Sequence, residues 1–169
     1  MRCIWIIIEI IRIMSKQFFV IAHNIRSLFN VGSIFRTSDA FGVTKIYLTG
    51  YTPTPEVPKH KLKIGKTALG AEDFVPWEYR LRPSMVVKDL RLQLPKISIV
   101  ALENNTKSVP LNTFKPKFPI ALVLGEEVNG IAKPLLALCD EVVEIPMYGK
   151  KESLNVSVAF GIAAYGLTK

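Results

Sequence analysis

The feature that most constrains this chain is the alternation of short apolar runs with longer segments of helical spacing. The apolar runs are QFFVIAHNI (17–25), KIYLTG (45–50), ISIVALE (97–103), PIALVLG (119–125) and EVVEIP (141–146). The segments of helical character are SLFNVGSIFRTSDAFG (27–42), PSMVVKDLRLQL (83–94), KPLLALC (133–139) and SLNVSVAFGIAAYGL (153–167). Strands that alternate with helices and are apolar along their length form parallel sheets covered on both faces. We therefore predict an α/β fold, a Rossmann-like parallel sheet with helices on both faces.

The connection between residues 51 and 83 differs from the rest of the chain in composition. It carries several prolines and the basic cluster KHKLKIGK (59–66), so we expect a long, loop-rich segment there. Long loops inside compact domains are usually lids or binding segments. In parallel sheets ligands bind beyond the carboxyl ends of the strands, so the segments that follow the runs at 45–50, 119–125 and 141–146 are the candidate site.

Length and composition indicate one folded domain, which we place at residues 14–169. The chain has 169 residues, of which 49% are hydrophobic and 21% charged, as in an ordinary globular protein. The first thirteen residues form a very apolar stretch that Glu9 and Arg12 interrupt; it is too short to span a membrane and lacks a signal-peptide cleavage site. We interpret residues 1–13 as an upstream extension before Met14; an added edge strand or docking segment is the alternative.

The charge balance favours a polyanionic partner. Lys and Arg outnumber Asp and Glu by 22 to 14, which gives a net charge of +8, and phosphate backbones are the usual partner of such a surplus. The same surplus also occurs in basic proteins that bind nothing. Cys3, Cys139, His23 and His60 have no metal-ligand spacing, so we expect no metal site and a reducing, cytoplasmic setting.

Two polar constellations follow predicted strands. The first is NVGSIFR, in which Asn30 and Arg36 lie six apart, so we expect them on neighbouring parts of one helix, with the arginine able to hold a phosphate. The second is LGEEVNGI, in which Gly125 lets the backbone approach a ligand and Glu126 and Glu127 follow at once. It has neither the G-x-G-x-x-G spacing of dinucleotide folds nor the Gly-Lys-Ser/Thr of a P-loop, which argues against NAD and ATP.

The third constellation is IPMYGKKESLNVSVAFG. We expect Ser153 to cap a helix whose first turn carries Asn155 and Ser157, after a basic turn with Lys150 and Lys151. A surface arginine, acids at a helix start and a capped buried helix are the ordinary structural explanations of the three segments taken one at a time.

Together the three segments, in this order and spacing, resemble motifs one, two and three of the SpoU (TrmH) family of the SPOUT superfamily. The resemblance runs from about residue 19 to 167, and KTALGAEDFVPWE (66–78) is similar to the loop that members place after their second strand. Members are RNA 2′-O-ribose methyltransferases and homodimers with a C-terminal trefoil knot, and they use S-adenosylmethionine. The resemblance implies an active site built from both chains.

The resemblance also assigns roles to residues of this chain. The implied cofactor-binding residues are Leu102, Gly125, Ile145, Met147, Ser153 and Leu154. The implied catalytic residues are Arg36, Asn30, Glu127, Ser153 and Asn155. This sequence departs from the family pattern at Glu126, where relatives often carry a small residue, and at Val128–Asn129, where many carry Gly–Glu. These departures surround Glu127, so they affect the assignment of Glu127 as a catalytic residue more than the assignment of Arg36.

The family proposal makes the arginine the general base. Since the pKa of an arginine is so high that its neutral form is scarce, we instead expect Arg36 to act as an electrostatic clamp on the developing alkoxide or a neighbouring phosphate. The candidate RNA contacts are the lysines of the basic cluster and of the turn before the third motif; the alternative is a solvated cluster that aids solubility. These residues are Lys59, Lys61, Lys63, Lys66, Lys150 and Lys151.

Several functional alternatives stay open. By its similarity to minimal family members the chain is expected to modify tRNA, with ribosomal RNA as the alternative substrate. A base-methylating SPOUT relative is a poorer match because the third motif contains SLNVS. A catalytically silent RNA-binding protein of the same fold, or a small-molecule nucleotide-binding protein, belongs to a different functional class.

Overall fold

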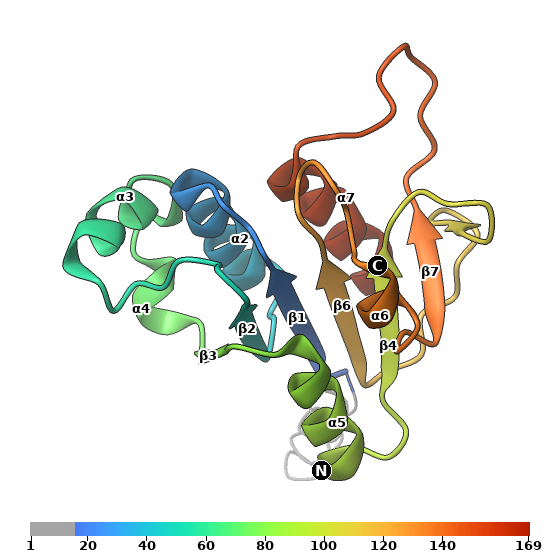
Figure 1. The fold of residues 1–169 in the computed structure, drawn as a ribbon, viewed down its shortest axis with the longest axis horizontal. Helices are drawn as coiled ribbons and strands as arrows, with labels where there is room; N and C mark the ends of the chain where they lie inside the picture. The colour runs from blue at the N-terminus through green and yellow to red at the C-terminus, as the bar shows by residue number, and fades with distance from the viewer. Residues whose placement is uncertain (1–15) are drawn as a thin grey trace, which may run out of the picture.

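The computed structural model describes residues 16–169, and the extension expected at residues 1–13 lies outside them. The strands are β1 Phe18–His23, β2 Lys45–Thr49, β3 Trp77–Arg80, β4 Ser98–Leu102, β5 Val109–Pro110, β6 Ile120–Leu124 and β7 Glu141–Glu144. They form one sheet in the order β3-β2-β1-β6-β4-β7-β5 (Figure 1). All its pairings are parallel. The predicted parallel α/β fold is confirmed.

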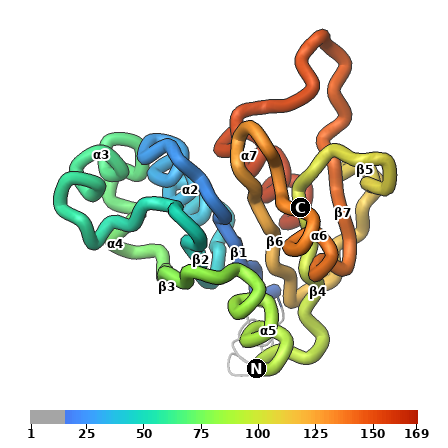
Figure 2. Tube along the Cα trace, viewed as in Figure 1, coloured from blue at the N-terminus to red at the C-terminus, as the bar shows by residue number. Residues whose placement is uncertain are grey.

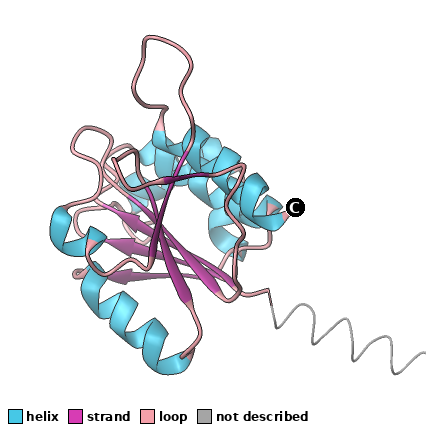
Figure 3. Ribbon diagram, turned by 90° about the vertical axis from the view of Figure 1, so that its right-hand side faces the viewer, coloured by secondary structure: helices cyan, strands magenta, loops and turns pink. Residues whose placement is uncertain are grey.

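Helices cover both faces of the sheet (Figure 3). One face carries α2 Leu28–Ala40, α3 Pro58–Ala68, α4 Ala71–Phe74 and α7 Val156–Thr168, and the other carries α5 Pro83–Gln93 and α6 Lys133–Leu136. The side chains of β1 show why both faces need cover: Val20 and Ala22 enter the first core, whereas Phe19 and Ile21 enter the second. This alternation turns an uninterrupted apolar run into a strand buried on both sides.

The segment 51–83 is not the long loop that its prolines predict. It contains α3, α4 and the edge strand β3 (Figure 2). Pro58 stands in the first turn of α3, where a missing amide hydrogen costs nothing. Ile64 and Ala68, four residues apart, are buried against the core. The four lysines of the helix, at positions 59, 61, 63 and 66, hide this narrow apolar stripe in the sequence, which is why the helix escaped prediction.

The strand order brings loops from distant parts of the chain to one edge of the sheet. β1 and β6 are neighbours, with Ala22 opposite Leu124, and β6 pairs with β4, which pairs with β7. Because the pairings are parallel, the loops after these strands and the start of α7 all lie at the carboxyl edge (Figures 1 and 2). This edge is where α/β proteins bind ligands.

Candidate active site

A cavity of about 650 Å³ opens at the carboxyl ends of β4, β6 and β7. That volume lies within the usual range for small-molecule sites, about 300–1,000 Å³. All six predicted cofactor-binding residues line it: Leu102, Gly125, Ile145, Met147, Ser153 and Leu154. The structure therefore brings together positions that span more than fifty residues of sequence, while their role in holding a cofactor remains a prediction.

The turn after β6 forms one wall of the cavity and requires glycine. A Cβ atom at Gly125 would lie 2.5 Å from the carbonyl carbon of Gly130 and 2.6 Å from Cγ1 of Ile131. Gly130 itself has a φ of +64°, in the left-handed region that favours glycine. Glu126 N donates to Gly130 O at 3.1 Å, and Gly130 N donates back to Glu126 O at 2.9 Å. The backbone here is packed too closely for a side chain.

Carboxylates dominate the polar lining of the cavity. They are Glu103, Glu126, Glu127, Glu144 and Glu152, and none of the described residues that line the cavity is a lysine or an arginine. Several of them accept hydrogen bonds; for example, Ile131 N donates to Glu103 Oε2 at 2.8 Å, and Ser108 Oγ donates to Glu144 Oε2 at 2.5 Å. A cavity lined by both apolar side chains and carboxylates suits a ligand that has apolar parts and a positive charge.

Side chains of the three motifs meet in one hydrogen-bond network at the edge of this cavity. Asn30 Nδ2 donates to Glu127 Oε1 at 2.9 Å, and Asn155 Nδ2 donates to Asn30 Oδ1 at 3.2 Å. Asn155 Oδ1 in turn accepts from the backbone N of Ser157 at 3.0 Å and from its hydroxyl at 2.7 Å. Asn30 thus connects the turn after β6 to the start of α7, although 97 and 125 residues separate it from these two partners.

Two sequence expectations about these motifs are wrong in detail. The cap of α7 is Asn155 rather than Ser153; Ser153 lies in the preceding loop, where it lines the cavity. Arg36 is exposed and, within residues 16–169, has no hydrogen bond or ion pair with Asn30 or Glu127. Six residues of α-helix turn about 600°, which leaves the two side chains about 120° apart rather than side by side.

A second group of polar residues adjoins the cavity and was missed by the sequence analysis. Glu126 accepts from Asn129 Nδ2 at 2.8 Å, and this hydrogen bond is the main cause that holds the pKa of Glu126 below its usual value. His23, at the end of β1, has its Nδ1 2.9 Å from Thr49 Oγ1, and burial lowers its pKa, against the opposing effect of Glu126. The sequence signals were the departures from the family pattern at Glu126 and at Val128–Asn129.

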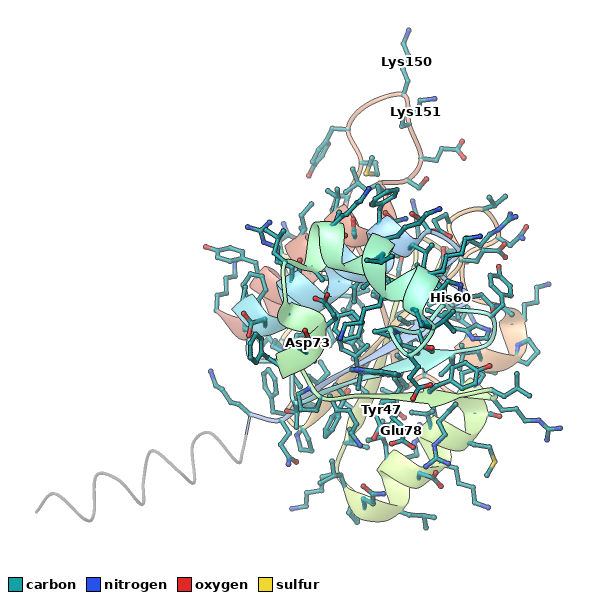
Figure 4. All side chains as sticks on the ribbon, turned by 90° about the vertical axis from the view of Figure 1, so that its left-hand side faces the viewer. Tyr47, His60, Asp73, Glu78, Lys150 and Lys151 are labelled. Carbon is teal, nitrogen blue, oxygen red and sulfur yellow. The ribbon has the colours of Figure 1, made fainter. Side chains whose placement is uncertain are left out.

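The candidate RNA-contacting lysines fall in two separate places. Lys59, Lys61, Lys63 and Lys66 are exposed on α3. Lys61 is paired with Asp73 at 2.8 Å, and this hydrogen bond raises its pKa. Lys150 and Lys151 stand at the tip of the loop between β7 and α7, which projects beyond the body of the molecule (Figure 4). The legs of that loop line the cavity through Met147, Ser153 and Leu154.

The chain is similar in sequence to proteins of known function. Residues 17–165 match the SpoU rRNA Methylase family. A tRNA (guanosine(18)-2′-O)-methyltransferase from Aquifex aeolicus is 35% identical over 157 residues, 93% of this chain and 71% of the relative. A 23S rRNA (guanosine-2′-O-)-methyltransferase, RlmB, from Escherichia coli is 30% identical over 158 residues, 93% of this chain and 62% of the relative.

A solved structure shows the same fold with a cofactor. The SpoU methyltransferase AviRb from Streptomyces viridochromogenes, in complex with AdoMet, superposes with a TM-score of 0.79 at 26% identity, covering 90% of this chain and 59% of AviRb. The chain thus spans between about three fifths and seven tenths of the length of these proteins.

Proposed function

Because this chain belongs to the SpoU rRNA Methylase family, we propose that it transfers a methyl group from S-adenosylmethionine to a ribose 2′-hydroxyl of RNA. The observation that carries the proposal is the Asn155–Asn30–Glu127 network beside the cavity. It links the three motifs at the carboxyl edge of the sheet, where a ligand binds. The predicted family membership and parallel fold are confirmed, and the predicted activity agrees with that of the named relatives.

The cavity fits the cofactor in shape and charge. Leu102, Ile145, Met147 and Leu154 supply apolar cover, and the fixed carboxylates of the rim favour a cation. S-adenosylmethionine supplies, when bound, a methyl group already activated by its sulfonium charge. The protein therefore has to orient the acceptor ribose and stabilise its 2′-oxygen, which loses its proton and takes over the methyl group from sulfur.

Arg36 is the residue proposed to stabilise that oxygen. Its guanidinium can hold the developing alkoxide or the adjacent phosphate with two parallel hydrogen bonds, while the hydroxyl proton leaves to phosphate or water. The proposed roles of the other motif residues follow from their contacts: Asn30, Glu127 and Asn155 hold the acceptor side of the site in one arrangement, and Ser153 lines the cavity itself.

We further propose that the active protein is a homodimer whose site uses residues of both chains and whose C-terminal segment forms the family's trefoil knot. The exposed position of Arg36 on α2, away from the network of its own chain, supports a site completed by a second copy. The outer face of α7 supports it too, since Val158, Ile162 and Tyr165 are 50%, 42% and 61% exposed. Such a stripe of large apolar side chains commonly marks an interface.

The dimer is tested by analytical ultracentrifugation of the wild type and of Ile162→Asp, which puts a charge in the middle of that stripe. A wild-type dimer and a monomeric, folded variant are expected. A monomeric wild type that still transfers methyl groups would contradict the dimer.

The proposed substrate is tRNA, because the 35%-identical relative acts on tRNA; the RlmB relative makes ribosomal RNA the second candidate. The lysines of α3 and of the loop tip are the proposed contacts to phosphates. We place the activity in the cytoplasm, where RNA modification takes place. Within residues 16–169, none of the helices has the length and apolar character to cross a bilayer, and no cluster of ligating side chains is placed to hold a metal.

The proposal is tested by a methyl-transfer assay with labelled S-adenosylmethionine on total tRNA and on ribosomal RNA in separate reactions. Label is expected in one pool, at a linkage that resists alkaline hydrolysis as a 2′-O-methylated linkage does. Arg36→Ala is expected to lower turnover by about 100- to 1,000-fold.

Arg36→Lys is the matched variant, because it keeps the charge and loses the two-pronged geometry. Near-full turnover by Arg36→Lys would show that the paired hydrogen bonds do not matter. If neither RNA pool is labelled and the protein does not bind the cofactor, the chain is a catalytically silent RNA-binding protein of the same fold rather than an enzyme.

A further inference from the structure

The outer face of α3 carries apolar side chains as well as lysines. At 3.6 residues per turn, four exposed side chains fall on one arc of about 100°. They are Lys59, Leu62, Lys63 and Lys66. Leu69, the C-cap of the helix, follows Leu62 by two turns on the same side. Leu62 is 75% exposed and Leu69 65%, so this surface is basic and apolar at once.

The short helix α4 borders this face. Lys61 Nζ donates to Asp73 Oδ1 at 2.8 Å (Figure 4), and a Cβ atom at Gly65 would lie 2.8 Å from Glu72 Oε1. Because Lys61 and Gly65 are one turn apart, α4 packs along the side of α3 that they form. That side adjoins Leu62, so the surface of α4 continues the outer face of α3.

Phe74 presents an aromatic ring from a fixed turn on this surface. Val75 N donates to Ala71 O at 2.9 Å, and the side chains of Ala71 and Val75 are buried in the core. Between these anchored residues, Phe74 is 79% exposed. A Cβ atom at Gly70 would lie 3.7 Å from its Cε2, so the ring lies over Gly70, next to Leu69. The ring is held in place and open to a ligand.

The acidic side chains of α4 do not oppose a polyanion here. Asp73 is neutralised by Lys61, and Glu72 is buried, with its Oε2 accepting from Gly70 N at 3.0 Å. The charge that faces solvent around the ring is therefore that of the lysines. Surfaces that combine lysines with an exposed aromatic ring bind single-stranded nucleic acid, because the cations follow the phosphates while the unpaired bases stack. A duplex offers the same phosphates but keeps its bases stacked inside.

We propose that α3 and α4 form a binding surface for an unpaired segment of RNA, with one base stacked on the ring of Phe74. The neighbouring phosphates contact Lys59, Lys63 and Lys66. This base is not the nucleotide that is methylated, since α2 lies between α3 and α7 (Figure 1) and the start of α7 lines the cavity. The inference rests on the proposed function and adds to it the kind of RNA segment that is held beside the site.

The test uses a short oligouridine strand with 2-aminopurine as its one purine, alone and paired with a complementary strand. The fluorescence of 2-aminopurine falls when the base stacks on an aromatic ring. Wild-type protein is expected to quench it on binding the single strand. Phe74→Ala should abolish the quenching and weaken the single strand about 10-fold, while its affinity for the duplex stays that of the wild type. Phe74→Trp, which keeps an aromatic ring, should retain both quenching and affinity.

Leu92→Ala is the matched control, because it removes an equally exposed apolar side chain from α5, on the opposite face of the sheet; it should change neither quantity. The inference is overturned if Phe74→Ala still quenches the strand, or if it weakens the duplex as much as the single strand. It is also overturned if Phe74→Ala changes the sedimentation of the protein, which would make Phe74 part of a protein interface. Quenching that depends on Phe74 without any methyl transfer would instead overturn the proposed function and leave the RNA surface standing.

Discussion

The cavity over β4, β6 and β7 and the outer surface of α3 differ in charge and in the way their side chains are held. Around the cavity, carboxylates such as Glu103 and Glu144 accept hydrogen bonds at 2.8 and 2.5 Å from donors fixed by the fold. On α3 the charged groups are lysines, of which Lys61 is paired; within the part of the chain that the structure describes, Lys59, Lys63 and Lys66 have no ion pair.

This difference assigns the two ligands of the proposed reaction to different places. Fixed acceptors around a close-packed turn select one small cation by shape and charge. Exposed lysines attract any phosphate backbone and contribute affinity rather than sequence preference. The opposite charges also keep the polyanion from filling the cavity, so that only the nucleotide at its rim approaches.

The largest effect is expected from adding a side chain to the close-packed turn that forms the wall of the cavity. Gly125→Ala places a Cβ against the Gly130 backbone, and overpacking of this kind costs enough to weaken cofactor binding by roughly 10- to 100-fold. Calorimetric titration with S-adenosylmethionine measures the effect, and RNA affinity should stay unchanged. Gly149→Ala is the matched control, since a Cβ there meets nothing within 4 Å. Equal cofactor affinities for the two variants would show that the turn is not part of the site.

The next largest effect is expected on the basic surface. Replacing Lys59, Lys63 and Lys66 together by Gln removes three exposed cations from α3 and should weaken RNA binding about 10-fold at low salt. The slope of log affinity against log salt should become shallower by about 2, since each phosphate that a lysine neutralises contributes roughly 0.7 to it. Cofactor affinity should not change.

The control for that experiment removes the same charge elsewhere. Lys88, Lys96 and Lys117 are also exposed, and Lys88 lies on α5, on the opposite face of the sheet. Their replacement by Gln should leave the salt slope near that of the wild type. If both triple variants lose RNA affinity equally, net charge rather than the α3 surface attracts the RNA.

The same two regions mark what the sequence could predict. The cavity was predictable because its residues follow apolar strands and lie within recognisable motifs, so all six candidate positions line one cavity. Helix α3 was not, because lysines outnumber the two buried side chains, Ile64 and Ala68, that hold it to the core. Strand β5 is only two residues long, Val109–Pro110, too short for any periodicity.

Contacts between motifs were beyond prediction for a different reason. The hydrogen bond between Asn30, which follows β1, and Glu127, which follows β6, depends on the pairing of β1 with β6 in the sheet. Periodicity indicates that strands exist, and it does not say which are neighbours. The prediction for the start of α7 was wrong only in its N-cap residue. Both Ser153 and Asn155 are good capping residues, and the hydrogen bonds of Asn155 decide between them.

That cap allows a smaller and sharper test of the network beside the cavity. Asn155→Ala removes the acceptor for Ser157 N and should lower the free energy of unfolding by about 1 kcal/mol. Asn155→Asp keeps the acceptor and loses the donor to Asn30, so stability should stay within a few tenths of a kcal/mol while methyl transfer falls. Thermal unfolding and the transfer assay separate the two effects. Full activity in the Asp variant would reduce Asn155 to a helix cap.

The smallest expected effect concerns His23, which lies at the end of β1 between the two regions. Burial lowers its pKa from the ordinary value of 6.5, with Glu126 opposing the shift. The unfolded chain therefore binds the proton more readily than the folded chain, so the free energy of unfolding decreases as pH falls below about 6.5. Since His23 is only half-buried, solvent screening keeps this contribution below about 1 kcal/mol. His23→Gln, which cannot titrate, should lose less melting temperature than the wild type between pH 7.5 and 5.5. An identical loss in both proteins would mean that the pKa of His23 is the same in the folded and the unfolded chain.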